Sequence, residues 1–199
     1  EPMRVLYVDG EHTVDEAWAS KNGVDTSLVM GVGARWAEQV CESVEEATLS
    51  REIDLVVIDS TSVLTPKKEL EKSYGDSEKV AARATVLGRF VRRHLAAGFE
   101  DGLTARYRPT ILATSQVTTK GIGFGQHAYL DTTDGNMMDH AVSLDLWMTE
   151  EGYKLDPQNR HAIYGDFGFR VRKNKAGGSP KVSGTIRYWL RETPDHPVG

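Results

Sequence analysis

Short, nearly continuous apolar runs alternate with segments of helical periodicity along the first 116 residues. A run such as 53–58 is too short for a buried helix and ends at the polar pair Asp59 and Ser60, which is typical of a strand buried on both faces of a parallel sheet. This alternation predicts βαβ units. We therefore expect strands at 3–8, 27–32, 53–58 and 109–114, with helices at 15–21, 34–49 and 78–97.

The rest of the chain has a different pattern. Residues 117–135 are rich in glycine and poor in apolar residues, so we expect one long loop there. Strand-like runs follow at 141–149, 169–173 and 182–190. The expected fold class is α/β, a three-layer core with a mostly parallel central sheet extended by antiparallel C-terminal strands. A length of 199 residues suggests one domain, at 1–192, followed by a tail at 193–199.

Composition narrows the class of protein without identifying it. Hydrophobic residues make up 39% of the chain, which is enough for a sizeable core, and no apolar run is long enough to span a membrane. The net charge of −5 argues against a small protein that binds nucleic acid through overall charge, so any DNA contact must come from local basic patches. The single cysteine, Cys41, fits a reducing, cytoplasmic compartment and is interpreted as a small buried apolar residue.

Polar side chains follow three of the expected strands: Glu11, then Asp59 with Ser60, then Gln116. Ligands of open α/β sheets bind beyond the carboxyl ends of the strands, so these groups are expected to converge. Asp59 has the position of a Walker B acid, which holds Mg²⁺ directly or through water; the alternative is an N-cap of the next helix. Glu11 has the position of a carboxylate that orients or deprotonates an attacking water; the alternative is a solvated loop acid.

The residues shown contain no phosphate-binding loop of the form G-x-x-x-x-G-K-[ST]. The glycine clusters at 31–33 and 121–125 lack the Lys-Ser/Thr pair that reaches the β- and γ-phosphates. The histidines are scattered, and no H-E-x-x-H spacing occurs, so we expect no zinc site.

Four segments, 5–25, 53–71, 75–83 and 171–177, resemble RecA-family recombinases in order and spacing. The resemblance implies a RecA-like ATPase core over 1–192, with ATP and Mg²⁺ as cofactors. We interpret the chain as beginning after the phosphate-binding loop, which is removed or not included; a natural protein without that loop is the alternative. Departures from the family pattern in the DNA loops suggest a divergent or phage-type member.

The resemblance also implies roles at the nucleotide. Glu11 matches the catalytic glutamate, Gln116 matches the glutamine that senses the γ-phosphate, and Asp59 with Ser60 matches the Walker B segment. Asp15 and Trp18 match positions beside the adenine. Lys173 and Lys175 match a pair that reaches the ATP of a neighbouring subunit; the alternative for these lysines is the exposed face of an edge strand.

For DNA, the resemblance implies two loops and a helix start. Residues 67–77 match the first DNA-binding loop, and 117–136 match the second. On the helix between them, Arg93 joins three other basic residues on one face, for which a solvated surface is the alternative. Asp134 stands where the family usually has glycine and is expected to add negative charge near DNA. The residues expected to contact DNA are Lys79, Arg83, Arg89, Lys120, Gly121, Phe124, Gly135 and Asn136.

The expected function is that of a DNA-dependent ATPase. Such a protein forms a helical homo-oligomeric filament on single-stranded DNA and pairs it with homologous duplex DNA for strand exchange, in DNA recombination and repair. The expected compartment is the cytoplasm of a bacterium, or of the host of a phage. The alternative function is a non-catalytic RecA-like paralogue that binds DNA or a recombinase partner and regulates it. A RecA-fold helicase is a weaker third reading, since no helicase motif is present.

Overall fold

The computed structural model describes residues 2–33, 36–73, 82–100, 108–120, 129–132, 134, 136–158, 160–179 and 182–190. The chain divides into two compact units. The first consists of Glu1–Glu16 and Asp25–Ala141, and the second of Ala17–Val24 and Val142–Gly199.

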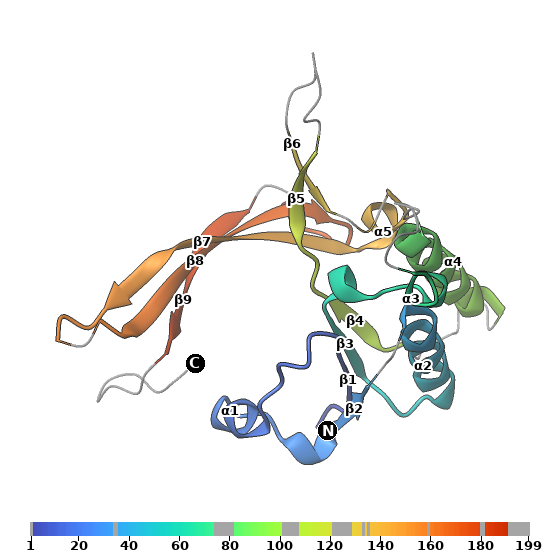
Figure 1. The fold of residues 1–199 in the computed structure, drawn as a ribbon, viewed down its shortest axis with the longest axis horizontal. Helices are drawn as coiled ribbons and strands as arrows, with labels where there is room; N and C mark the ends of the chain where they lie inside the picture. Colours follow the sequence, from blue (N-terminus) through green and yellow to red (C-terminus); the bar gives the residue numbers. More distant parts are fainter. Residues whose placement is uncertain are drawn as a thin grey trace. The chain divides into compact units, whose positions relative to one another are not determined.

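A four-stranded parallel sheet organises the first unit (Figure 1). Its strand order is β2-β1-β3-β4, from β1 (Val5–Asp9), β2 (Val29–Val32), β3 (Leu55–Asp59) and β4 (Thr110–Ala113). The parallel sheet and the α/β class confirm the sequence prediction. Residues 27 and 28 were expected in a strand but lie in a 3₁₀ turn, η1 (Thr26–Leu28), because the Asp25 side chain accepts a hydrogen bond from Ser27 N at 3.1 Å.

Two long helices, α2 (Ala37–Ser50) and α4 (Ala82–Glu100), pack on one face of this sheet. Successive strand residues point to opposite faces, so Leu6 and Val8 of β1 enter the core with Val56 of β3. The short helix α5 (Asn136–Ala141) contacts α4 and adds Met138 to this core. None of the described helices is long and apolar enough to cross a membrane.

The opposite face of the sheet is less covered in the described residues. Tyr7 and Val57 are half-buried there, while Leu112, the register partner of Val57, is 55% exposed. Parallel sheets are usually buried on both faces. The apolar side chains on this face are therefore typical of a sheet surface that is covered by a further layer of structure.

Two strands follow β4 and form an antiparallel hairpin, β5 (Val117–Lys120) and β6 (Tyr129–Thr132). Val117 pairs with Thr132, and Lys120 pairs with Tyr129. The prediction of a structureless loop over 117–135 is therefore wrong at both of its ends. The glycines that suggested a loop lie between the strands, at residues 121–125, outside the described part of the chain.

The second unit contains a three-stranded antiparallel sheet in the order β7-β8-β9. Its strands are β7 (Leu144–Leu155), β8 (Ala162–Asn174) and β9 (Ser183–Trp189), and this unit also takes most of the short helix α1 (Glu16–Lys21). Antiparallel C-terminal strands were predicted. Among the described strands they pair with one another, and β7 and β8 are longer than the sequence indicated.

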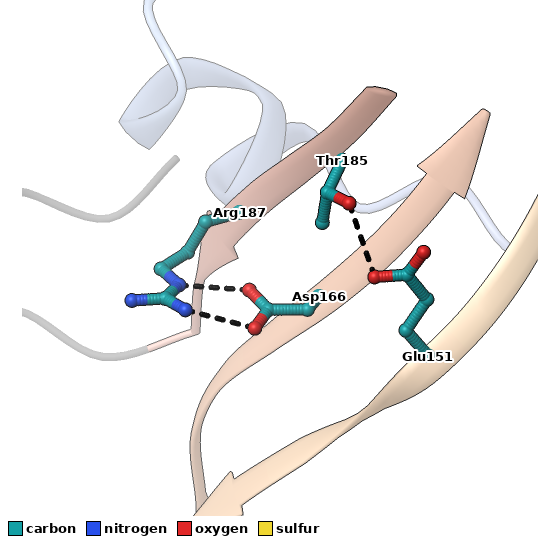
Figure 2. Close-up of polar contacts among 4 residues, drawn as sticks. All are labelled: Glu151, Asp166, Thr185 and Arg187. Atoms are coloured by element: carbon teal, nitrogen blue, oxygen red, sulfur yellow. Dashed lines mark hydrogen bonds and ion pairs between the residues drawn. The ribbon is translucent and has the colours of Figure 1, made fainter. Parts of the chain in front are cut away.

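One face of this second sheet is held by polar cross-strand contacts (Figure 2). Arg187 donates two hydrogen bonds to the Asp166 carboxylate, at 2.7 and 2.8 Å, and Thr185 donates to Glu151 at 3.1 Å. A Cβ at position 168 would lie 2.5 Å from Glu151 Oε1, so glycine leaves room for this carboxylate. The Arg187–Asp166 pair supports the register of β9 against β8, and the Thr185–Glu151 contact joins β9 to β7.

The structure places Cys41 on α2, packed against the core of the first unit. Burial, together with the smaller effect of the negative charges of Glu45, Glu38 and Glu42, raises the pKa of its thiol to about 12. The interpretation of Cys41 as an apolar core residue therefore agrees with its surroundings.

We expect the Cys41 thiol to react slowly with a disulfide reagent in the native chain. A pKa of about 12 in place of 9.0 lowers the thiolate fraction near pH 8 by roughly 10³, and greater intrinsic nucleophilicity recovers only about 10–30-fold. Labelling should therefore be on the order of 30–100-fold slower than in the denatured chain. Equal rates in the native and denatured chains would contradict this burial.

Candidate functional site

The ends of β1 and β3 lie side by side and carry most of the candidate site. Asp9 is the register partner of Asp59, and Gly10 N donates to Asp59 O at 2.7 Å. A Cβ on Gly10 would lie 2.7 Å from Val63 Cγ2, so only glycine lets the chain pass this closely. The close passage brings Glu11 to Ser60, whose Oγ donates to Glu11 Oε1 at 3.0 Å.

The Asp59 carboxylate is held from two neighbouring strands. Tyr7 on β1 donates its hydroxyl to Oδ2 at 3.1 Å, and Thr114, after β4, donates to Oδ1 at 2.6 Å. A carboxylate has about four lone-pair sites, so the two hydrogen bonds orient Asp59 and leave acceptor capacity on both oxygens. Burial first, and then the charge and hydrogen bond of Asp59, raise the pKa of Tyr7 to about 12.

Asp9 fixes the loop that carries Glu11. Its carboxylate accepts hydrogen bonds from Thr13 N at 3.2 Å and Val14 N at 3.1 Å. Desolvation raises the pKa of Asp9, but the backbone N–H groups of Val14, Thr13 and His12 lower it more, so its pKa lies below the usual value. An ionised Asp9 therefore holds the backbone on either side of the exposed Glu11 side chain.

A 3₁₀ turn, η2 (Thr61–Val63), follows Ser60 and contacts three other segments. Thr61 N donates to Thr114 O at 2.9 Å, and Gln116 N donates to Ser62 Oγ at 2.7 Å. Arg83, near the start of α4, donates through Nη1 to Ser62 O. Gln116 is thus positioned by its backbone beside the turn, with its side chain exposed.

Asp134 does not have the exposed position that its sequence context suggested. It is only 4% exposed, and its Oδ2 accepts a hydrogen bond from Thr61 Oγ1 at 2.6 Å. The Asp134 carboxylate is therefore held inside the first unit, and the expectation that it adds negative charge near DNA stays a prediction. No pattern in the sequence indicates the contact with Thr61.

The basic residues of α4 contact several different groups. Arg93 forms an ion pair with Glu45 of α2 at 2.6 Å, so its charge is compensated within the protein. Arg89 is exposed and lines a cavity of about 100 Å³ together with Glu38 and Glu42. The face that was expected to follow a phosphate backbone therefore lies partly against acidic residues of α2.

In the second unit, Trp18 has an aromatic neighbour that the sequence did not reveal. The rings of Trp18 and Tyr188 are 6.5 Å apart at their centroids and inclined by 57°. Tyr188 also donates its hydroxyl to Asn22 Oδ1 at 3.0 Å, which ties β9 to the segment after α1. Trp18 remains 39% exposed, and Asp15, which belongs to the first unit, is exposed as well.

Lys173 and Lys175 lie at the end of β8 and just after it. The alternative of an edge strand is wrong, because β8 is the central strand of its sheet. Lys173 is half-buried and pairs in register with Asp145, while Lys175 is exposed and donates its backbone N–H to Ser143 O at 2.7 Å. The remaining candidates, Lys79, Gly121, Phe124 and Gly135, and the side chains of Lys120 and Asn136, lie outside the described residues.

Two comparisons relate this chain to known proteins. The family model of the RecA N-terminal domain matches residues 3–181. Protein RecA of Corynebacterium diphtheriae is 36% identical over 178 residues, which are 89% of this chain and 45% of that protein. Protein RecA of Campylobacter hominis is 29% identical over 177 residues, 89% of this chain and 48% of that protein.

The matched part is less than half of these relatives, so the chain spans about half the length of the curated proteins that it resembles. The match nevertheless covers nearly the whole of the chain shown here, and it includes every described residue around Glu11, Asp59 and Gln116. The chain therefore belongs to the RecA family.

Proposed function

We propose that this chain is the central part of an ATP-dependent recombinase that forms a helical filament on single-stranded DNA and promotes strand exchange with homologous duplex DNA. The observation that carries the proposal is the group formed at the ends of β1 and β3. There Glu11 is hydrogen-bonded to Ser60, directly after the oriented carboxylate of Asp59. Two carboxylates in this arrangement suit one metal-binding role and one water-orienting role.

The carboxylates at this edge of the sheet suit magnesium, which would in turn hold the phosphates of a nucleoside triphosphate. Hard cations such as Mg²⁺ prefer oxygen ligands, and Asp59 offers carboxylate oxygens that keep acceptor capacity. When bound, Mg-ATP would supply the phosphoryl group whose hydrolysis drives the cycle. Glu11 would orient a water, and Gln116 would respond to the γ-phosphate from its place beside Ser62.

Trp18, whose ring lies beside that of Tyr188, is proposed to contact the adenine. Asp15 is proposed as a polar contact of the nucleotide, from its matching position in the family. In a filament, Lys173 and Lys175 would reach the nucleotide of the neighbouring subunit. The residues proposed to contact DNA remain Lys79, Arg83, Arg89, Lys120, Gly121, Phe124, Gly135 and Asn136. We propose that the protein acts in the cytoplasm of a bacterial cell.

A second candidate function is that of a non-catalytic RecA-like regulator. It is favoured by the compensation of Arg93 by Glu45, which removes one cation from the face of α4 proposed for DNA. The coding sequence upstream of Glu1 discriminates between the two functions. A G-x-x-x-x-G-K-[ST] motif within roughly 40 residues supports the ATPase, and its absence supports the regulator.

We expect the chain to bind single-stranded DNA weakly and with strong dependence on salt. With about three phosphate contacts, log K should fall with log salt concentration at a slope of about −2, or roughly 16-fold over a fourfold rise in salt. Fluorescence anisotropy of a labelled oligothymidylate measures this slope.

Replacing Lys120 with alanine should make that slope shallower by about 0.7. Lys154→Ala is the matched control, because Lys154 is an exposed lysine of β7 with no proposed role in DNA binding. An affinity that does not change with salt would refute the phosphate-contact part of the proposal.

A further inference from the structure

Both ends of the β5–β6 hairpin are attached to consecutive residues of the η2 turn. At the start of the hairpin, Gln116 N donates to Ser62 Oγ at 2.7 Å. At its end, Asp134 accepts a hydrogen bond from Thr61 Oγ1 at 2.6 Å. Both ends of the hairpin are therefore held at one point of the first unit, immediately after Ser60.

The contact at the end of the hairpin is buried. Asp134 is 4% exposed and Thr61 is 1% exposed. Asp134 Oδ1 is also buried and has no hydrogen-bond partner within the described residues. Burying a carboxylate with so few partners is unfavourable, so the Thr61 hydroxyl is a main contact that holds it in place. A glycine at position 134 could not make this contact.

The same turn is connected to the candidate catalytic groups. Ser60, the residue before Thr61, donates to Glu11. Thr61 N donates to Thr114 O, and the Thr114 hydroxyl donates to Asp59 Oδ1. Asp134 is thus linked through Thr61 to both carboxylates by short steps of backbone and hydrogen bonds.

We propose that Asp134 is a positioning residue that couples the β5–β6 hairpin to Glu11 and Asp59. On the function proposed above, on which this inference rests, single-stranded DNA bound at the hairpin changes the position of Thr61 through Asp134. The change at Thr61 in turn alters how Ser60 and Thr114 hold the two carboxylates. The coupling depends on the carboxylate of Asp134 and the hydroxyl of Thr61, and on neither residue alone.

Hydrogen exchange in a set of variants of the full chain tests the contact without requiring activity. Asp134→Gly and Thr61→Val should each speed exchange in segments 129–132 and 59–63, by roughly ten- to a hundredfold. The double variant should exchange no faster than Thr61→Val alone, because that variant already removes the contact with Asp134 together with the contact of the hydroxyl with Thr114 O at 3.0 Å. Asp134→Asn and Thr61→Ser keep an acceptor and a hydroxyl and should restore slow exchange. Additive effects, or no effect on segment 59–63, would overturn the proposal.

Measuring ATP hydrolysis with and without single-stranded DNA shows whether Asp134 couples the hairpin to the two carboxylates or only stabilises the fold. In a longer form of the protein that hydrolyses ATP, Asp134→Gly should reduce hydrolysis with single-stranded DNA by a larger factor than it reduces hydrolysis without DNA. Equal losses with and without DNA would overturn the proposal. If the unaltered long form neither binds DNA nor hydrolyses ATP while the exchange results are as expected, the coupling stands and the proposed recombinase function fails.

Discussion

Glu11→Gln is expected to abolish DNA-stimulated ATP hydrolysis in a longer form of this protein that carries a phosphate-binding loop. A positioned general base contributes about 10²–10⁴-fold to the rate, so kcat should fall by that factor. The amide keeps the size of Glu11 and can still accept the hydrogen bond that Ser60 donates at 3.0 Å. What it loses is the negative charge and the ability to accept a proton from water, so the lost rate reports that chemistry.

The matched control is Glu46→Gln, which makes the same chemical change at an exposed position of α2. Steady-state hydrolysis with saturating single-stranded DNA should be unchanged in this control. Filament assembly, observed by light scattering, should persist in both variants, because neither change removes a proposed DNA contact. Unaltered turnover in Glu11→Gln would refute the proposed role of Glu11.

The parallel strands could be predicted because burial on both faces requires consecutive apolar residues. The expected strand at 53–58 corresponds to β3 at Leu55–Asp59, and the difference lies only at its ends. Ile53 is 5% exposed although it precedes the strand, so its apolar character reflects burial and not strand structure. Hydrophobic pattern thus located these elements well and their boundaries less well.

The longer antiparallel strands were harder to recognise for a physical reason. β7 continues through Gly152, which has φ of 138°, and its register with β8 shifts between Glu150 and Gly152. A glycine between charged residues is typical of a turn, but here it accommodates a β-bulge and pairing resumes beyond it. The sequence shows the interruption and does not show that the partner strand continues.

The candidate site was predictable where it depends on sheet geometry alone. The carboxyl ends of parallel strands meet at one edge, so Glu11 and Ser60 were expected close together, and they are hydrogen-bonded. The contacts of Asp59 with Tyr7 and Thr114 have no signature in spacing, because each depends on tertiary pairing. The contact between Thr61 and Asp134 was missed for the same reason.

Helical periodicity located a basic face on α4 but could not identify what that face contacts. Arg93 lies opposite Glu45 of α2, and Arg83 donates to the backbone of Ser62. Helical periodicity describes the residues of a single helix, whereas the charge of a basic residue is compensated by acidic residues of the elements packed beside that helix. A basic helix face is therefore weak evidence for a DNA surface until its neighbours are known.

Leu87→Ala is expected to destabilise the first unit by about 2–5 kcal/mol, a large share of the roughly 5–15 kcal/mol typical of a native domain. Leu87 is 2% exposed and projects from α4 into the core. It lines a small cavity of about 30 Å³ with Val44 of α2, Ile58 of β3 and Met138 of α5. Truncation enlarges this cavity and removes contacts with all three elements, which adds to the lost transfer free energy.

Urea unfolding followed by circular dichroism measures the effect, and Arg92→Ala, an exposed position on the same helix, should change stability by less than about 0.5 kcal/mol. The helix that Leu87 anchors also carries Arg83, which donates to Ser62 O beside the candidate site. Loss of Leu87 should therefore speed hydrogen exchange at 59–63 as well as in α4. If Leu87→Ala lowered the free energy of unfolding by less than about 1 kcal/mol, α4 would not be packed on the parallel sheet as described.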